Sequence, residues 1–360
     1  MNKYGKLEFD REWHKMPIQK YETYKRDQQD LTDTRLRQIR LSLIKSSARS
    51  DYVAWNEFID WQESMTTDDA WRFLDQLRNA GLAERTVEEY MRIVQSFLAM
   101  MMTRGVVESN PIAYVIDEAE FEIEESSQLE LTVSQLGNFI KSIPKPHYRA
   151  SALLHAKNGI RNGENNNIDL PHLHLDHPDY YRFLEKRDIE LHEQIKERPD
   201  SLYIPSEPTI GEEYNGEVRG AGNKRKNDTI IPIDMETKFM LLNWLAVRPL
   251  AEYPHPLWVT QDNTRVHHQS FRSYIKNCAV EAGLIDDTAD RKFSVHWFRH
   301  FFTTQLRPGH GNYSEYLEPT MIKYLRGDVE DDIMEVYTHD WGNTIRAEYI
   351  DSIYQFGIYE

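Results

Sequence analysis

Four segments of the chain contain side chains that could bind or attack a phosphate, and each of these segments has an unusual local sequence. NGIRNGE carries Arg161 and Glu164, SVHWFRHFFTTQL carries His296 and Arg299, and VYTHDW carries Tyr337 near an expected helix end. The fourth, GNKRKNDTIIP, is a cluster of lysine and arginine that leads into an expected strand. Each segment alone is weak, because an arginine on a helix surface is usually solvated or ion-paired. Their joint content is what indicates chemistry.

Two arginines, a lysine and a histidine gathered at one point would form a strong clamp for an anion. Such a clamp suits a phosphodiester, because its transition state spreads additional negative charge over the non-bridging oxygens. A tyrosine beside the clamp could attack the phosphorus and form a covalent intermediate that stores the energy of the broken bond. Rejoining would then need no cofactor and no metal. The sequence has no GxxxxGK[ST] phosphate loop that would favour a competing chemistry.

Taken in order, the segments resemble the motifs of the tyrosine recombinase (phage integrase) family over nearly the whole chain. GIRNGE resembles the first arginine box, G-L-R-x-x-E, and HWFRH fits the H-x-x-R box. The resemblance implies that Arg161 and Arg299 hold the non-bridging oxygens of a DNA phosphate, with Glu164 as a supporting acidic neighbour and His296 helping to manage a proton. VYTH resembles the I-Y-T-H motif, which implies that Tyr337 is the nucleophile.

The catalytic lysine is assigned by register. KRKNDTIIP is similar to the family's hairpin motif, in which a lysine stands eight positions before the proline that closes the strand. This register selects Lys224, with Lys226 and Arg225 as neighbours in the same charged cluster and Lys226 as the rival. The resemblance implies that Lys224 protonates the departing 5′-oxygen.

One position departs from the family pattern. A histidine, or sometimes a tryptophan, normally stands nine residues before the nucleophile, whereas this chain has Asp328 nine residues before Tyr337. The spacing keeps Asp328 as a candidate site residue, but a carboxylate cannot donate a hydrogen bond as a neutral imidazole does. It could accept one from an active-site group, or His300 or His339 could substitute. The sequence leaves these possibilities open.

The order of elements predicts an α+β fold that is mainly helical. Apolar residues at helical spacing predict a helical domain at 20–111, preceded by a basic arm at 1–19 and followed by an acidic linker at 112–131. A capping box at Thr132 begins a domain at 132–360, in which SLYIP and DTIIPI are expected strands. The resemblance implies a SAM-like core-binding domain and then a tyrosine recombinase catalytic domain with a small β-sheet.

Composition limits the partners. A net charge of −16 disfavours nucleic acid, but residues 1–50 hold twelve Lys and Arg against seven Asp and Glu. DNA binding therefore requires a locally positive groove. The resemblance implies double-stranded DNA as the partner and a homotetramer on two DNA sites, and the sequence leaves accessory proteins unknown. A single cysteine, the lack of an apolar span and the lack of a secretory signal predict a cytoplasmic protein without a membrane partner.

Alternatives remain for the function and for single residues. A type IB topoisomerase would use nearly the same residues, and a DNA-binding protein derived from a recombinase would bind without cutting. Tyr349 is the alternative nucleophile, although its helical pattern favours packing. His172, His174 and His177 could suggest a metal, but their irregular spacing without cysteines favours surface histidines.

Overall fold

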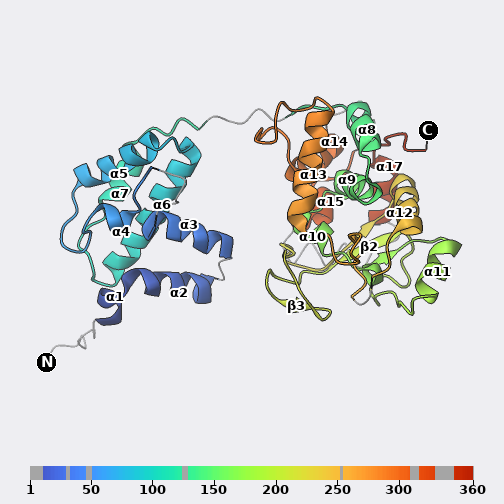
Figure 1. The fold of residues 1–360 in the computed structure, drawn as a ribbon, viewed down its shortest axis with the longest axis horizontal. Helices are drawn as coiled ribbons and strands as arrows, with labels where there is room; N and C mark the ends of the chain where they lie inside the picture. Colours follow the sequence, from blue (N-terminus) through green and yellow to red (C-terminus); the bar gives the residue numbers. More distant parts are fainter. Residues whose placement is uncertain are drawn as a thin grey trace. The chain divides into compact units, whose positions relative to one another are not determined.

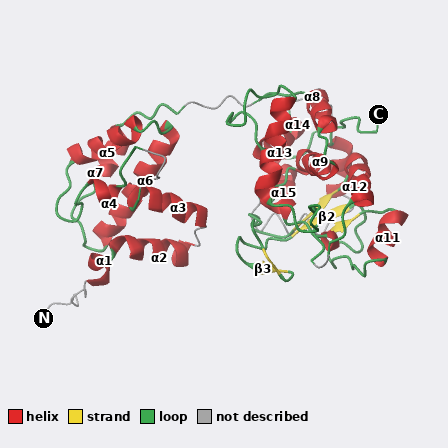
Figure 2. Cartoon of the chain, in the orientation of Figure 1, coloured by secondary structure: helices red, strands yellow, loops and turns green. Residues whose placement is uncertain are grey.

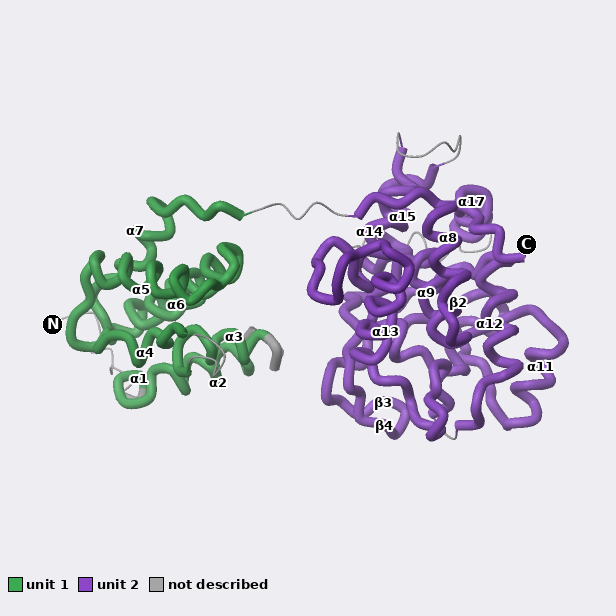
Figure 3. The backbone as a smooth tube through the Cα atoms, turned by 45° about the horizontal axis from the view of Figure 1, so that its top comes forward, with its two compact units in different colours: residues 1–125 green, residues 126–360 purple. Residues whose placement is uncertain are grey.

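A computed structural model describes residues 11–29, 33–45, 51–123, 129–251, 254–308, 316–328 and 344–359. Residues 1–125 and 126–360 form two compact units, called here the first and second units and coloured separately in Figure 3. The described chain is mainly helical with a small antiparallel sheet (Figure 2), as the sequence predicts. None of its described helices combines the length and the apolar character needed to cross a membrane.

Helices build the described part of the first unit (Figure 1). They are α1 (Arg11–Lys15), α2 (Pro17–Gln29), α3 (Asp33–Leu43), α4 (Trp55–Phe58), α5 (Thr67–Asn79), α6 (Glu84–Thr103) and α7 (Pro111–Glu118). A capping box begins α5, because the Thr66 hydroxyl accepts from the Asp69 amide while the Asp69 carboxylate accepts from the Thr66 amide. Helix α5 therefore begins directly after a local capping signal in the sequence.

Aromatic side chains fill the core of the first unit. The Trp55 ring meets Phe73 edge-on at 5.0 Å between centroids, and Trp61 meets Phe97 in the same way at 5.0 Å. Trp55 and Phe97 are fully buried. Edge-to-face pairs of this kind add to the stabilisation from burial. These residues therefore belong to the core of the first unit.

The ends of the first unit differ from the prediction. Trp13 and Ile18 are buried in its core, so residues 11–19 belong to the bundle and not to a separate arm. At the other end, α7 occupies the start of the predicted linker, and its residues Ile112 and Val115 are fully buried. The prediction ended the helical domain at Pro111, but proline is tolerated in the first turn of a helix, where its missing N–H has no partner to lose.

The second unit combines helices with short strands. Its helices are α8 (Val133–Ser142), α9 (Pro146–Asn158), α10 (Asn162–Asn166), η1 (Leu170–His172), α11 (Pro178–Glu185), α12 (Met235–Val247), α13 (His268–Glu281), α14 (Val295–Leu306), α15 (Pro319–Arg326) and α17 (Arg346–Ser352). Its strands are β1 (Leu173–His174), β2 (Ser201–Ile204), β3 (Glu213–Tyr214), β4 (Glu217–Val218) and β5 (Thr229–Pro232). The predicted capping box at Thr132 is present, since its side chain accepts from the Gln135 amide.

The sheet has the order β1-β2-β5, and both of its pairings are antiparallel. Leu202 lies opposite Ile231, so the two predicted strands are confirmed as partners. The chain between them, residues 205–228, includes the small hairpin β3–β4. Asn215 and Gly216 form its turn with positive φ angles of 52° and 71°, which the glycine and the asparagine tolerate best. This connecting segment carries Lys224.

Helix α9 lies in the core of the second unit and packs against α12 and α14 (Figure 1). From Ala150 to Asn158 all of its residues are buried, as expected for a helix covered on every side. Its buried Lys157 ammonium is paired with Asp234 and Glu236, each at 2.8 Å. A helix held this firmly gives a rigid base to the residues that follow it, which begin the candidate site.

Candidate active site

Arg161 is placed by the way in which α9 ends. Gly159 takes the left-handed conformation (φ 59°), and a side chain there would collide with the Phe302 ring, 2.5 Å from the expected Cβ position. The chain then turns so that Arg161 caps α10. The Glu164 carboxylate accepts from the Arg161 amide (2.8 Å) and from its Nη1 (2.8 Å). Glu164 therefore fixes both the backbone and the guanidinium of Arg161.

Glu164 stays ionised although its side chain is fully buried. Burial alone would raise its pKa, but the charges of Arg225 and Arg161 hold that pKa below its ordinary value. The Arg225 Nη2 lies 3.2 Å from Glu164 Oε2 on the side away from Arg161 Nη1, which contacts Oε1. The carboxylate thus separates two cations that would otherwise repel each other.

Arg299 extends from α14 toward the same point. Its Nη1 donates to the carbonyl oxygens of Gly159 and Arg326, each at 2.7 Å, and only 2% of the side chain is exposed. Burial and the nearby charges of Arg161 and Arg326 lower the pKa of Arg299 to about 9, so it remains cationic at neutral pH. These contacts hold a guanidinium in one orientation before any ligand arrives.

His296 lies one turn before Arg299 on α14 and opens to solvent on one side. Partial burial and then the charges of Arg299, Arg326 and Arg161 lower its pKa, against a smaller opposing effect from Asp328. The imidazole is therefore neutral at pH 7. A neutral ring can accept a proton or donate one, which suits the role expected for it.

Asp328 closes the cluster. Helix α15 ends at Gly327, whose φ of 68° turns the chain back toward Arg161 and Arg299. The Asp328 Oδ1 lies 2.5 Å from Arg161 Nη2 and 2.5 Å from Arg299 Nη2, while Oδ2 lies 2.9 Å from Arg326 Nη2. One carboxylate therefore meets three guanidinium groups.

The structure thus brings together several of the residues chosen from the sequence. Arg161, Arg299 and Asp328 share direct contacts, and His296 lies within their electrostatic influence. Lys224 is exposed on the connecting segment, and its rival Lys226 is exposed as well. Tyr337 and His339 lie outside the described residues. The catalytic roles of all these residues remain predictions.

The sequence did not single out two arginines of the cluster as site residues. Arg326 pairs with Asp328, and Arg225 is buried beside Glu164. Arg225 also donates to the Leu325 carbonyl at 3.1 Å, and its side chain packs on Gly327. The sequence Lys-Arg-Lys at 224–226 could have indicated that Arg225 is buried. Alternate residues of an extended chain point to opposite sides, so the middle one can point inward.

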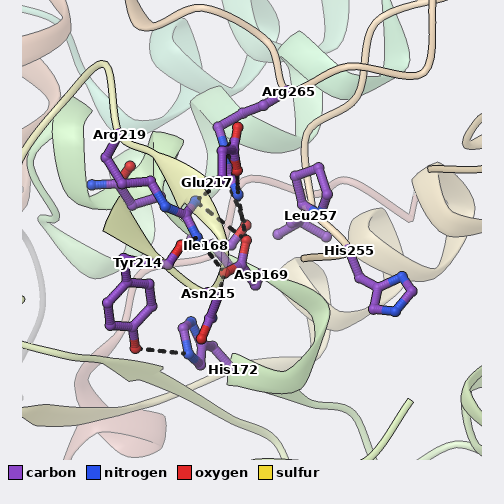
Figure 4. A network of polar contacts seen from close by, with 12 residues as sticks. Ile168, Asp169, His172, Tyr214, Asn215, Glu217, Arg219, His255, Leu257 and Arg265 are labelled. Atoms are coloured by element: carbon purple, nitrogen blue, oxygen red, sulfur yellow. Dashed lines mark hydrogen bonds and ion pairs between the residues drawn. The ribbon is translucent and has the colours of Figure 1, made fainter. Parts of the chain in front are cut away.

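A buried ion-pair network holds the connecting segment that carries Lys224 (Figure 4). Arg219, from that segment, reaches Asp169 at 2.8 Å, and Arg265 reaches the other carboxylate oxygen at 2.5 Å. Arg265 also pairs with Glu217 of β4 at 2.8 Å, and the side-chain Nδ2 of Asn215 donates to Asp169 at 3.0 Å. The hairpin β3–β4 is thereby attached to the body of the second unit. Arg225 attaches the same segment at its other end.

The prediction of surface histidines is wrong for two of the three. His172 and His174 are buried, and the His174 Nδ1 lies 2.7 Å from the Ile195 carbonyl oxygen. Burial lowers the pKa of His172 to about 4, which keeps it neutral. Among the described residues no group of histidine, cysteine and acidic side chains could hold a metal ion. The spacing that looked irregular reflects η1 and β1, which turn successive side chains inward.

Tyr349, the alternative nucleophile, is part of the core. Its side chain is fully buried on α17, its hydroxyl donates to the Lys157 carbonyl at 3.0 Å, and burial raises its pKa far above the ordinary value. A phenol in this position cannot reach a phosphate at the arginine cluster. His300 is exposed, with its Nε2 3.5 Å from the Thr304 hydroxyl.

Solved structures with the same architecture come from integrases. The Tn1549 transposon integrase in complex with a circular intermediate DNA matches with a TM-score of 0.59 and 14% identity, over 89% of this chain and 93% of that chain. A lambda integrase tetramer bound to a Holliday junction matches with a TM-score of 0.53 and 12% identity, over 91% and 84%. A lambda integrase dimer bound to a COC′ core site gives 0.51 and 13%, over 91% and 77%.

The chain has the fold of these integrases. No protein-family model matches the sequence, and no curated protein does either. Identity of 12–14% explains this contrast, because the integrase fold depends on the pattern of buried positions more than on particular residues. In this integrase fold the described arginines, His296 and Asp328 form a cationic cluster on a chain whose net charge is −16.

Proposed function

We propose that this protein is a site-specific DNA recombinase that cleaves and rejoins DNA through a 3′-phosphotyrosyl intermediate. The observation that carries the proposal is the convergence of Arg161 Nη2 and Arg299 Nη2 on one oxygen, the Oδ1 of Asp328, each at 2.5 Å. Two guanidinium groups aimed at one oxygen are the arrangement that a non-bridging phosphate oxygen requires. The integrase fold supports the same function.

The reaction follows from the groups available. In the proposal, Tyr337 attacks the scissile phosphate while Arg161 and Arg299 stabilise the charge that develops on the non-bridging oxygens. His296, neutral at pH 7, takes part in moving the tyrosine proton, and Lys224 gives a proton to the departing 5′-oxygen. The phosphotyrosine then exchanges with the 5′-hydroxyl of a second strand, which restores the backbone and frees the tyrosine. The proposed cleavage and rejoining steps require no metal ion and no nucleotide.

Assembly and partners belong to the same proposal. Double-stranded DNA is the substrate, and a homotetramer on two DNA sites would exchange the strands, which the likeness to the lambda integrase tetramer on a Holliday junction supports. We place this activity in the cytoplasm. The locally cationic cluster answers the objection raised by the acidic total charge, because steering and binding of a phosphate depend on the nearby field.

The test uses a library of nicked duplexes with randomised sequence, since the target site is unknown. A nick close to the cleavage point lets the short 5′-hydroxyl fragment diffuse away, so that the covalent protein–DNA adduct accumulates. We expect adducts with the wild-type chain, attachment at Tyr337 by mass spectrometry, and none with Tyr337→Phe. Adducts that persist in Tyr337→Phe would contradict the assignment. Binding without any adduct would indicate a DNA-binding protein, and relaxation of plasmids that lack a selected site would indicate a topoisomerase.

A further inference from the structure

Asp328 occupies the place where an anionic ligand would bind. Its Oδ1 is shared by Arg161 Nη2 and Arg299 Nη2, and its Oδ2 pairs with Arg326. A carboxylate and a phosphate present the same feature to a guanidinium, which is a pair of oxygens that share negative charge. The carboxylate of Asp328 and an incoming phosphate oxygen would therefore compete for the same N–H groups.

The Nη1 atoms of the two arginines already have partners. Arg161 Nη1 is bound to Glu164, and Arg299 Nη1 is bound to the carbonyl oxygens of Gly159 and Arg326. Their Nη2 atoms are left to face Asp328. A phosphate cannot gain the two N–H groups that face Asp328 until the carboxylate moves away.

The position of Asp328 allows such a movement. Its side chain is 27% exposed, close to the 24% of Arg161 and Arg326 and far above the 2% of Arg299, so the carboxylate is open to solvent. The Asp328 amide donates to the Lys323 carbonyl at 2.9 Å, which closes the end of α15 and is independent of the carboxylate. Rotation about the short side chain can therefore free the arginines without unfolding the helix.

Charge favours exchange of one anion for another. The cluster contains four cations and two anions: Arg161, Arg225, Arg299 and Arg326 with Glu164 and Asp328. Glu164 lies between two of the arginines. If the Asp328 carboxylate left with nothing in its place, three guanidinium groups would lose a shared partner. Leaving a partly buried charge unpaired is unfavourable, so the carboxylate leaves only when another anion arrives.

We propose that Asp328 is an internal anion that closes the phosphate site of the free protein and is displaced by the scissile phosphate. The inference rests on the proposed function, because it names how that same site is regulated. DNA that is held by many contacts displaces the carboxylate at low concentration, whereas an isolated anion displaces it only at high concentration. Asp328 thereby lowers the affinity of the site for wrong or isolated phosphates.

Inorganic sulfate, a tetrahedral anion, tests this on the full chain. We expect Asp328→Asn to bind sulfate at least about tenfold more tightly than the wild type in calorimetric titrations at constant ionic strength, because the variant lacks the carboxylate charge that repels the anion and competes with it. Asp262→Asn is the matched control, since Asp262 is exposed on the second unit and the same charge is removed. Equal or weaker binding by Asp328→Asn would overturn the inference.

A second measurement needs no variant of Asp328. Carbodiimide coupling labels accessible carboxylates, and mass spectrometry reads each position. Saturating sulfate should raise the labelling of Asp328 in the wild-type chain and leave that of Asp262 unchanged. Unchanged or lower labelling of Asp328 at saturation would contradict displacement.

The two proposals fail separately. Sulfate binding requires neither Tyr337 nor cleavage, so tighter binding by Asp328→Asn without any DNA adduct would keep the inference and remove the recombinase. Adducts at Tyr337 together with unchanged sulfate affinity in Asp328→Asn would keep the recombinase and remove the internal anion.

Discussion

Replacing Arg225 with methionine should destabilise the second unit by about 3 kcal/mol. The guanidinium is buried, and its Nη2 donates to Glu164 Oε2 at 3.2 Å and to the Leu325 carbonyl at 3.1 Å. Removing one partner of a buried ion pair typically lowers the free energy of unfolding by about 3–5 kcal/mol, since the other charge is left behind. Glu164 keeps Arg161, so the lower end of that range applies. Methionine fills the space of the arginine stem, which limits the loss to the polar contacts.

The assay must resolve the two units. Hydrogen exchange pulsed at increasing urea concentration and read by mass spectrometry reports the unfolding midpoint of individual peptides. Peptides from α9 and α14 should unfold at lower urea in Arg225→Met, and peptides from α6 in the first unit should be unaffected. Lys224→Met is the matched control, because it removes a cation from the adjacent, exposed position and should change stability by no more than about 0.5 kcal/mol.

Two results would refute the reasoning. A loss below about 1 kcal/mol in Arg225→Met would mean that the buried pair contributes no more than an exposed one. An equal loss in Lys224→Met would mean that the total charge of the segment matters and the contacts of Arg225 do not.

Arg299→Lys should lower the rate of adduct formation about 100-fold, because one ammonium cannot replace the two aimed nitrogens; a near-normal rate would argue against the clamp. Lys224→Ala should slow cleavage of ordinary DNA about 100-fold yet leave cleavage of a 5′-bridging phosphorothiolate nearly normal, since sulfur departs without a proton; equal losses on both substrates would remove the general-acid role. Gly327→Ala should lower the free energy of unfolding by more than about 1 kcal/mol in urea titrations, because φ is 68° and a Cβ would lie 2.7 Å from Arg225 Nη1; an unchanged midpoint would contradict this. Burial lowers the pKa of His155 to about 4, so between pH 6.5 and pH 5 the unfolded chain binds a proton that the folded chain does not. The free energy of unfolding therefore decreases as the pH is lowered from 6.5 to 5. In urea titrations over this range, His155→Gln should lose about 2 kcal/mol less of this free energy than the wild type; equal losses would exclude His155 as the source.

The fold could be predicted as far as local signals reached. The capping box at Thr132 and the two strands of the sheet appear where the sequence places them. The boundaries were less accurate. Pro111 was interpreted as the end of the first domain, yet it begins a helix whose buried face belongs to that domain. A proline can either end one helix or begin another, and which of the two occurs depends on what packs against the following residues.

The candidate site shows the same division. Motif spacing selected Arg161, Arg299 and Asp328, which the structure brings together. It did not select Arg225, because a buried arginine and an exposed lysine are alike in a charged sequence until the fold turns one of them inward. The buried network around Asp169 was also missed, since its partners Arg219 and Arg265 are 50 and 96 positions away.

The sequence by itself determined which chemistry could be proposed for this protein, because the types and order of its side chains resemble the motifs of the tyrosine recombinases. Only the tertiary structure decided what the departure at Asp328 means. Its carboxylate reaches Arg161 across 167 positions of the chain and Arg299 across 29. Electrostatic energy depends on distances in space, and these are set by the packing of α9, α14 and α15 and not by spacing along the chain.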